Sequence, residues 1–208
     1  YTAWRNSFIH SAFENSAATI SGVEAAYQAL RRRGKLDKEY KFLAVGGDGG
    51  TYDIGLQSLS GAMERGHNMV YICYDNEAYQ NTGNQRSSST PMGSNTTTSP
   101  AGQVIPGRQG KRKDLTEIMV SHHIPYVAQS TGYHWNDLYN KLEKAFAVEG
   151  PAFLNVLSPC VPGWKYSTEK TMEYNRIAVE TCFWPLYEVE NGNYKINRIP
   201  KKKLPVEE

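Results

Sequence analysis

The chain has 208 residues, of which 39% are hydrophobic and 21% charged, and its formal net charge is +2 at pH 7. This length and apolar content exclude a disordered chain and predict a single domain over residues 1–208. Nearly balanced charge without a long basic face makes nucleic acid an unexpected partner. No apolar run approaches the roughly 18 residues of a membrane span, and no signal peptide opens the sequence, so we expect no membrane partner and a cytoplasmic location.

Predicted strands and helices alternate along the chain. The spacing of apolar residues predicts helices over residues 14–33, 53–64, 113–122, 135–148 and 172–182. Apolar runs predict strands over residues 41–45, 69–74, 125–129 and 152–157, followed by a hairpin over 186–196 that turns at Asn191-Gly192. In the helix over 53–64, one buried side is expected to hold Ile54, Leu56, Leu59 and Met63, with Asp53 and Glu64 at solvated positions. The alternation predicts an α/β fold, a mostly parallel sheet with helices on both faces.

Residues 86–110 interrupt this alternation with a segment rich in Ser, Thr, Asn, Gly and Pro. A flexible surface loop is one interpretation of such a composition. Loops of this length in compact domains are usually functional or disordered, however, and functional residues often lie on loops that a rigid scaffold positions. We therefore expect residues 86–110 to form an active-site or interface loop.

Polar motifs follow the first two predicted strands. Residues 46–50 read Gly46-Gly47-Asp48-Gly49-Gly50, and Asn76 follows Asp48 by 28 positions. Glycines let backbone N–H groups approach a diphosphate closely, while a carboxylate and an amide oxygen can bind one hard cation such as Mg²⁺. Alone, Asp48 would fit a turn or a helix cap, and Asn76 a strand-end turn. Parallel sheets bind ligands at the carboxyl ends of their strands, so the pair predicts a metal and diphosphate site there.

The second motif continues as Asp75-Asn76-Glu77-Ala78-Tyr79-Gln80-Asn81-Thr82-Gly83-Asn84-Gln85. Together with the Gly-Asp-Gly triplet, it resembles the thiamine diphosphate motif in the thiamine-binding (beta) subunit of the 2-oxoacid:ferredoxin oxidoreductases. Within that family the likeness is greatest to the pyruvate:ferredoxin oxidoreductases. A Gly-Asp-Gly triplet alone is a common turn, and the second motif at this spacing makes the resemblance specific. It extends along nearly the whole chain and includes Tyr52-Asp53-Ile54-Gly55, Ser158-Pro159-Cys160 and Trp184-Pro185-Leu186-Tyr187.

The resemblance implies a thiamin diphosphate-binding fold and oxidative decarboxylation of pyruvate with coenzyme A, giving acetyl-CoA and CO₂. Electrons would pass through iron–sulfur clusters to ferredoxin, and the reaction would be reversible. Other subunits of the complex would be partners, and the glutamate that engages the thiamine pyrimidine would come from a different domain or subunit. Three alternatives stay open: a sister enzyme for a branched-chain, indolic or 2-oxoglutarate substrate, a non-oxidative thiamine enzyme, and a non-catalytic assembly subunit.

The resemblance also assigns roles to single residues. Asp48 and Asn76 would bind Mg²⁺ through their side chains, and Ala78 through its backbone carbonyl. Asn81 would be catalytic, near the thiazolium and the substrate, where an amide can stabilise developing charge; ordinary loop chemistry is the alternative for this residue. The cofactor-binding residues would be Gly47, Asp48, Gly49, Gly50, Asn76, Ala78, Asn81 and Thr82.

Cysteine usage raises one further question. The three cysteines, Cys73, Cys160 and Cys182, have no CxxC spacing, which argues against a disulfide framework. Cys160 resembles the family's cysteine ligand to the [4Fe-4S] cluster nearest the thiamine, whose other ligands lie upstream of the region matched here. Either this chain lacks the family's N-terminal cluster-binding segment, as its start at Tyr1 favours, or Cys160 is only a thiol. Cys73 and Cys182 are expected to be small buried hydrophobes.

Overall fold

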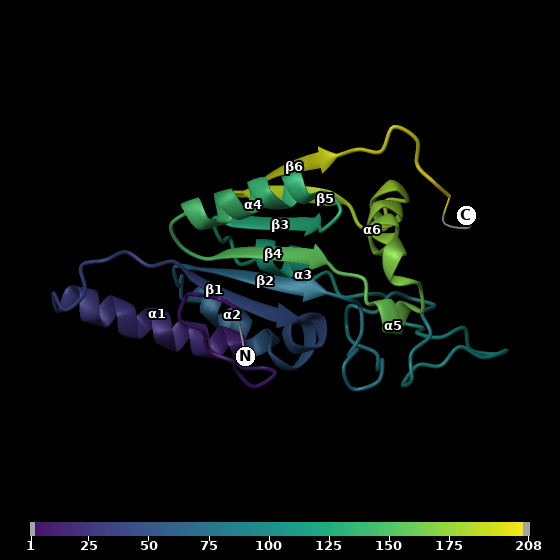
Figure 1. Cartoon of the computed structure of the whole chain (residues 1–208), viewed down its shortest axis with the longest axis horizontal. Coiled ribbons are helices and arrows are strands. Elements are labelled where there is room, and N and C mark those ends of the chain that lie inside the picture. Colours follow the sequence, from purple (N-terminus) through teal and green to yellow (C-terminus); the bar gives the residue numbers. More distant parts are fainter. Residues whose placement is uncertain (1–2, 206–208) are drawn as a thin grey trace.

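A six-stranded sheet organises the protein, and Figure 1 shows the computed structural model. The structure describes residues 3–205, so Tyr1 and Thr2, which belong to the predicted domain, lie outside the described part, as do residues 206–208. The strand order is β1-β2-β4-β3-β5-β6, with β1 to β4 parallel and the last two strands antiparallel. The strands are β1 (Phe42–Gly47), β2 (Met69–Asp75), β3 (Tyr126–Thr131), β4 (Ala152–Leu157), β5 (Leu186–Glu190) and β6 (Asn193–Arg198).

Helices cover both faces of this sheet, which confirms the predicted α/β architecture. The helices are α1 (Ser16–Arg32), α2 (Leu56–Glu64), α3 (Leu115–Val120), α4 (Trp135–Ala147), α5 (Val161–Trp164) and α6 (Thr171–Glu180), with the short turns η1 (Gly49–Ile54) and η2 (Thr168–Lys170). Side chains from α1, α2 and α3 share one hydrophobic cluster with one face of the sheet. α4 packs on the opposite face in a second cluster. No helix within residues 3–205 is long and apolar enough to cross a membrane.

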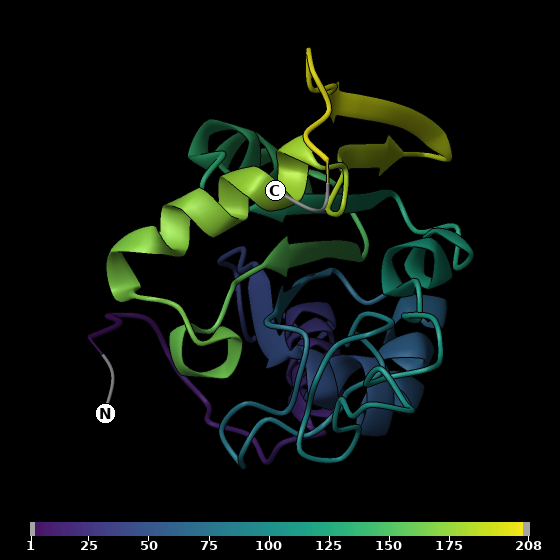
Figure 2. The same cartoon turned by 90° about the vertical axis from the view of Figure 1, so that its right-hand side faces the viewer.

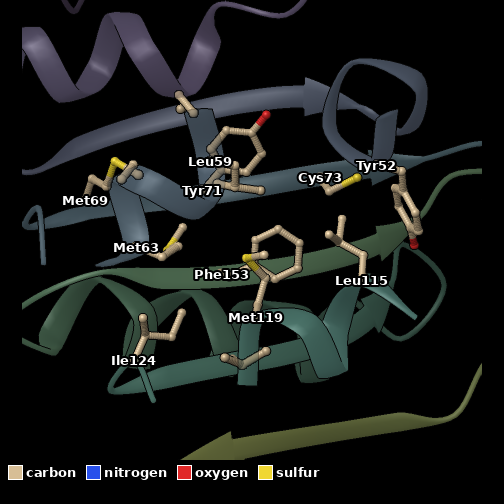
Figure 3. Close-up of a cluster of buried hydrophobic side chains, with 14 of the residues drawn as sticks. Tyr52, Leu59, Met63, Met69, Tyr71, Cys73, Leu115, Met119, Ile124 and Phe153 are labelled. Carbon is tan, nitrogen blue, oxygen red and sulfur yellow. The ribbon is translucent and has the colours of Figure 1, made fainter. Parts of the chain in front are cut away.

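The alternation of side chains along β2 separates the two clusters. Tyr71 and Cys73 point to the face that α2 and α3 cover, whereas Val70 belongs to the cluster under α4. Figure 3 shows the larger cluster, in which the rings of Tyr71 and Phe153 stack with centroids 6.1 Å apart. A slip of one residue would move each side chain to the opposite face of the sheet, so the separate packing of these two clusters specifies the register of the parallel strands.

The helix predicted over residues 53–64 differs in its first turn. Residues 49–54 form a π-helical turn, and α2 begins only at Leu56. Ile54 is 52% exposed, so its predicted burial is wrong, whereas Leu59 and Met63 are buried as expected. The wider π turn changes the angular spacing of side chains, which removes Ile54 from the apolar side of α2. This irregular turn begins directly after Asp48.

Candidate functional site

The two predicted motifs lie side by side at the carboxyl edge of the sheet. β1 and β2 are neighbours, and Gly47 is in register with Tyr74, so Asp48 and Asn76 leave adjacent strand ends. Asp75 is in register with Leu157 at the end of β4, which brings the segment containing Cys160 to the same edge. Figure 2 looks onto this edge, with residues 86–110 folded across its lower part.

Three predicted magnesium ligands converge there. The side-chain amide of Asn76 lies 2.9 Å from Asp48 Oδ1 and 2.8 Å from the carbonyl oxygen of Ala78. With Nδ2 turned toward them, Asn76 donates a hydrogen bond to each oxygen. With Oδ1 turned toward them, it lies 2.9 and 2.8 Å from two other oxygens, an arrangement that a hard cation stabilises. The residues therefore fit Mg²⁺, through a carboxylate, an amide oxygen and a backbone carbonyl.

Asp48 is buried, and its surroundings within the described residues are acidic. Only 2% of it is exposed, and its Oδ2 accepts a hydrogen bond from Ser87 Oγ at 2.5 Å. Burial, with the charge of Asp75 as the next cause, raises the pKa of Asp48 to about 7. No Lys, Arg or His within residues 3–205 forms an ion pair with this carboxylate. A bound cation would supply the missing positive charge.

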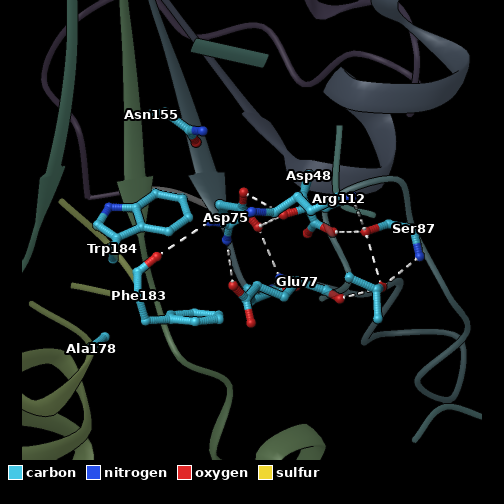
Figure 4. A network of polar contacts seen from close by, with 12 residues as sticks. Asp48, Asp75, Glu77, Ser87, Arg112, Asn155, Ala178, Phe183 and Trp184 are labelled. Atoms are coloured by element: carbon cyan, nitrogen blue, oxygen red, sulfur yellow. Dashed lines mark hydrogen bonds and ion pairs between the residues drawn. The ribbon is translucent and has the colours of Figure 1, made fainter. Parts of the chain in front are cut away.

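Two further buried carboxyl groups lie beside it in the network of Figure 4. Asp75 accepts hydrogen bonds from Ser89 Oγ at 2.7 and 2.6 Å and from the backbone N–H of Glu77 at 2.9 Å. Burial raises the pKa of both acids, and the charge of Asp75 raises that of Glu77 further. Glu77 pairs with Arg112 at 3.0 Å. The sequence patterns do not predict Asp75, Glu77 or Arg112 as site residues.

The predicted diphosphate glycines differ in their surroundings. A Cβ on Gly47 would meet only a ring carbon of Tyr74, 4.0 Å away, so this position leaves room for a ligand. A Cβ on Gly49 would lie 2.4 Å from the ring of Tyr79, and one on Gly50 would lie 2.8 Å from the carbonyl oxygen of Phe13. Packing within the chain therefore requires Gly49 and Gly50, whereas Gly47 is open. The first N–H groups of a helical turn lack internal acceptors and can bind phosphate, which suits the start of η1.

The first part of residues 86–110 is ordered against these acids. Ser87, Ser89 and Thr90 are at most 1% exposed, and two of them bond to Asp48 and Asp75 as described. Arg108 donates to the carbonyls of Ser87 and Ser88 at 2.9 and 3.1 Å. Asp53 accepts from Ser88 N at 3.1 Å and from the Tyr79 hydroxyl at 2.9 Å, so its predicted solvated position is wrong. In the sequence, the run Ser87-Ser88-Ser89 resembles low-complexity sequence, which hides the contacts of its hydroxyl groups with the buried acids.

Asn81 and Thr82 lie in an exposed turn and take no part in the contacts among Asp48, Asn76 and Ala78. Paired backbone hydrogen bonds between Tyr79 and Gln85, at 2.9 and 3.2 Å, close this turn at its base. The Thr82 hydroxyl donates to the side chain of Gln85. The side chain of Asn81 is accessible from solvent, at the same edge of the sheet as Asn76.

Cys160 follows β4 and precedes α5, where it is partly buried. Trp164 joins its segment to the oxygen cluster, because the indole Nε1 donates to the carbonyl of Asn76 at 3.0 Å and the backbone N–H donates to the carbonyl of Cys160 at 2.8 Å. Cys73 is buried in β2 and Cys182 is partly buried, and all three cysteines are free thiols. Within residues 3–205 no group of three His, Cys, Asp or Glu side chains is placed to hold a metal ion, so a cluster at Cys160 needs ligands from outside this part of the chain.

Comparison with known proteins shows the family of this chain. The thiamine pyrophosphate enzyme family, C-terminal TPP binding domain, matches residues 1–156. Pyruvate synthase subunit PorB of Thermotoga maritima is 55% identical over 210 residues, which cover all of this chain and 65% of that protein. PorB of Methanocaldococcus jannaschii is 57% identical over 209 residues, 100% of this chain and 70% of the relative. Ketoisovalerate oxidoreductase subunit VorB of Pyrococcus abyssi is 47% identical over 205 residues, 99% of this chain and 66% of the relative.

A solved structure shares the fold. The 2-oxoglutarate:ferredoxin oxidoreductase from Magnetococcus marinus superposes with a TM-score of 0.62 at 22% identity, over 79% of this chain and 50% of that one. This chain spans about two thirds of the length of the PorB relatives from Thermotoga and Methanocaldococcus. On the family match and these identities, the chain belongs to the thiamine pyrophosphate enzymes and carries their C-terminal TPP binding domain.

Proposed function

We propose that this chain forms the thiamine diphosphate-binding part of a pyruvate:ferredoxin oxidoreductase. The complex would convert pyruvate and coenzyme A to acetyl-CoA and CO₂ and pass two electrons through iron–sulfur clusters to ferredoxin, reversibly. The observation that carries this proposal is the convergence of Asp48, Asn76 and the Ala78 carbonyl at two adjacent strand ends. The identity of more than 50% to two subunits named pyruvate synthase PorB favours pyruvate as the 2-oxoacid.

The chain's own residues would hold and orient the reacting groups. Asp48, Asn76 and Ala78 would bind Mg²⁺, and Gly47 would let the diphosphate approach the backbone; Gly49, Gly50 and Thr82 would complete the predicted cofactor contacts. When bound, thiamine diphosphate supplies a carbanion that attacks the 2-oxoacid carbonyl and an electron sink for decarboxylation. The exposed amide of Asn81 would donate a hydrogen bond to the developing negative charge on the substrate. Residues 86–110 would serve as the active-site loop, from which Ser87 and Ser89 donate hydrogen bonds to Asp48 and Asp75.

Cys160 would be one ligand of a [4Fe-4S] cluster close to the cofactor. Such a cluster requires further thiolates, which would come from the remainder of the subunit or from another polypeptide of the complex. The hydrogen bond from the Trp164 indole to the carbonyl of Asn76 connects the segment that holds Cys160 with the turn that would hold the metal. Other subunits of the complex, ferredoxin, pyruvate and coenzyme A would therefore be its partners.

Anaerobic viologen reduction by the native complex tests the proposal. Reduction is expected to require pyruvate, coenzyme A, thiamine diphosphate and Mg²⁺ together, and to be lost in Asp48→Ala. Asp37→Ala is the matched control, because Asp37 is an exposed aspartate that precedes β1. Absence of reduction by a complex that retains its iron and thiamine would refute the oxidoreductase assignment.

Parallel reactions separate the alternatives. Faster reduction with 2-oxoisovalerate, 2-oxoglutarate or indolepyruvate would identify a sister enzyme, a possibility to which the 47% identity with VorB draws attention. Release of CO₂ without coenzyme A or an electron acceptor would identify a non-oxidative thiamine enzyme. Failure of the complete complex to bind thiamine diphosphate would leave an assembly subunit.

A further inference from the structure

The turn after β2 has an unusual backbone between two predicted metal ligands. Glu77 lies between Asn76 and Ala78, and its φ is 67°. This left-handed region is uncommon for residues other than glycine, and it persists in folded proteins where surrounding contacts hold it. The orientation of this one residue decides where the preceding side chain and the following carbonyl point. Contacts that fix Glu77 therefore also fix the two ligands beside it.

Each polar group of Glu77 has a partner. Its backbone N–H donates to Asp75 Oδ1 at 2.9 Å, and its carbonyl accepts from Thr90 Oγ1 at 2.5 Å. Its carboxylate pairs with Arg112 Nη1 at 3.0 Å, with the side chain of Glu77 7% exposed and that of Arg112 26% exposed. The first two contacts come from segments adjacent to the site. Arg112 comes from the chain just before α3.

Arg112 is itself held by residues from the C-terminal part of the sequence. Its guanidinium lies over the rings of Phe183 and Trp184, 5.1 and 5.0 Å from their centroids, and Nη2 donates to the carbonyl of Phe183 at 3.3 Å (Figure 4). Trp184 is fully buried, and its Nε1 donates to the carbonyl of Ser130 at 2.9 Å. Planar stacking and several donors on one rigid fork suit arginine and not lysine. These contacts hold the guanidinium in place in addition to its ion pair with Glu77.

From these contacts we propose that Arg112 is a positioning residue, which through its ion pair with Glu77 holds the turn after β2 so that Asn76 and Ala78 face Asp48. The inference rests on the proposed magnesium and thiamine diphosphate site and names a new determinant of it. Arg112 touches neither the metal nor the cofactor in this scheme. It connects the segment between α6 and β5 to the geometry of the metal ligands.

The direction in which Arg112→Gln changes Mg²⁺ affinity distinguishes a positioning role from a purely electrostatic one. A cation near the site repels Mg²⁺, so electrostatics alone predicts tighter Mg²⁺ binding when Arg112→Gln removes the charge. Positioning predicts weaker binding, with a dissociation constant about 10- to 100-fold higher, as is typical when residues that orient metal ligands are lost. Arg112→Lys keeps the charge but loses the fork and the stacking, and is expected to restore binding only in part.

The experiment measures the Mg²⁺ dissociation constant by titration calorimetry of the native complex, freed of cofactor and then supplied with thiamine diphosphate. Arg112→Gln, Arg112→Lys, Glu77→Gln and the double variant Arg112→Gln/Glu77→Gln are compared with wild type. The double variant is expected to bind Mg²⁺ as weakly as Arg112→Gln does, because both substitutions break the same ion pair. If the two substitutions acted only through their charges, their opposite effects would cancel in the double variant, and its Mg²⁺ affinity would equal that of wild type. Because it leaves no unpaired charge, the double variant also serves as the test if Arg112→Gln fails to assemble.

Two controls make failure of this inference distinct from failure of the proposed function. Arg176→Gln removes a similarly exposed arginine from its ion pair with Glu180 on α6 and is expected to leave Mg²⁺ affinity unchanged. Asp48→Ala is expected to abolish Mg²⁺ binding. If Asp48→Ala does so while both Arg112→Gln and the double variant stay within about twofold of wild type, the positioning role is refuted and the site stands. If wild type shows no Mg²⁺ binding with thiamine diphosphate, both the site and the positioning role are refuted.

Discussion

Two regions of the domain bury carboxylates, and they treat the negative charge in opposite ways. Glu188 on β5 accepts hydrogen bonds from the Tyr126 hydroxyl at 2.7 Å and from Lys144 at 2.9 Å. Asn197 and Lys195 contact its other oxygen at 3.0 and 3.2 Å. Burial alone would raise the pKa of Glu188, but these donors outweigh it and bring the pKa down to about 2.

At the carboxyl edge of the sheet, Asp48 is equally buried, and no cationic side chain in the described part of the chain forms an ion pair with it. Burial and the nearby Asp75 raise its pKa to about 7, and the hydrogen bond from Ser87 opposes this only partly. A carboxylate supplied with cations by its own chain stabilises the fold. A carboxylate kept beside other acids, without a cation of the chain, is typical of a site where binding of a ligand provides the stabilisation. This contrast distinguishes the structural acid, Glu188, from the proposed metal ligand, Asp48.

Asp48→Asn is expected to have the largest effect and to act in two directions. Mg²⁺-dependent binding of thiamine diphosphate should be lost, because an amide cannot replace the carboxylate charge. The cofactor-free complex should become more stable at pH 8, since the substitution removes an unpaired buried charge. A gain of about 1 kcal/mol would raise the unfolding midpoint by about 2–4 °C. Calorimetric titration and thermal unfolding with a chelator measure the two effects, and a lower midpoint would contradict the description of Asp48.

Glu188→Gln should have the opposite effects: it should destabilise the fold and leave Mg²⁺ binding intact. Loss of charge-assisted hydrogen bonds is expected to lower the free energy of unfolding by about 1–3 kcal/mol, while Mg²⁺ affinity stays at the wild-type value. Glu190→Gln on the same strand is the matched control, because Glu190 is 51% exposed and lies 3.8 Å from Lys144. Its effect should stay within about 0.5 kcal/mol. Weaker Mg²⁺ binding in Glu188→Gln would show that the two regions are energetically coupled.

Gly47→Ala should weaken the cofactor site without destabilising the fold. A methyl group there meets no protein atom nearer than 4.0 Å but occupies space next to the predicted diphosphate. We expect the thiamine diphosphate dissociation constant to rise about tenfold, which corresponds to about 1.4 kcal/mol. Gly22→Ala in α1, where a Cβ has nothing within 4 Å, is the control and should only add about 0.5–1 kcal/mol of helix stability. Unchanged cofactor affinity in Gly47→Ala would remove Gly47 from the site.

The smallest expected effect is a difference in pH dependence. The pKa of Glu188 is lowered from 4.5 to about 2 by folding, so its contribution to stability is present above pH 4.5 and is lost as the pH falls toward 2. The pKa of Asp48 is raised from 3.8 to about 7, so proton binding favours the folded state below pH 3.8 and this advantage is lost as the pH rises to 7. Unfolding of the chelator-treated complex from pH 3 to 8 should show Glu188→Gln flattening the acid limb and Asp48→Asn flattening the neutral one.

The scaffold was predictable because the central strands β3 and β4 and most of β2 are buried on both faces, and such strands begin with apolar runs in the sequence. The position of Asp48 and Asn76 followed, since parallel strands end at one edge. The sequence could not predict the contacts of Ser87 with Asp48, nor those of Arg112 with Glu77, because partners so far apart in the chain have no local signature. The exposure of Ile54 was missed for another reason: a π turn obeys a different period from the α-helix that the pattern assumed.

The connection from Phe183 and Trp184 through Arg112 to Glu77 also bears on the order in which the protein folds. Residues from the first, middle and last parts of the sequence meet in that one network. Contacts between such distant segments require large loops to close, and chains dominated by them fold slowly. The proposed metal site should therefore form among the last events of folding, after α6 and β5 have docked. Appearance of Mg²⁺ affinity during refolding would then report completion of the native state, later than the burial of Tyr71 and Phe153 in the central sheet.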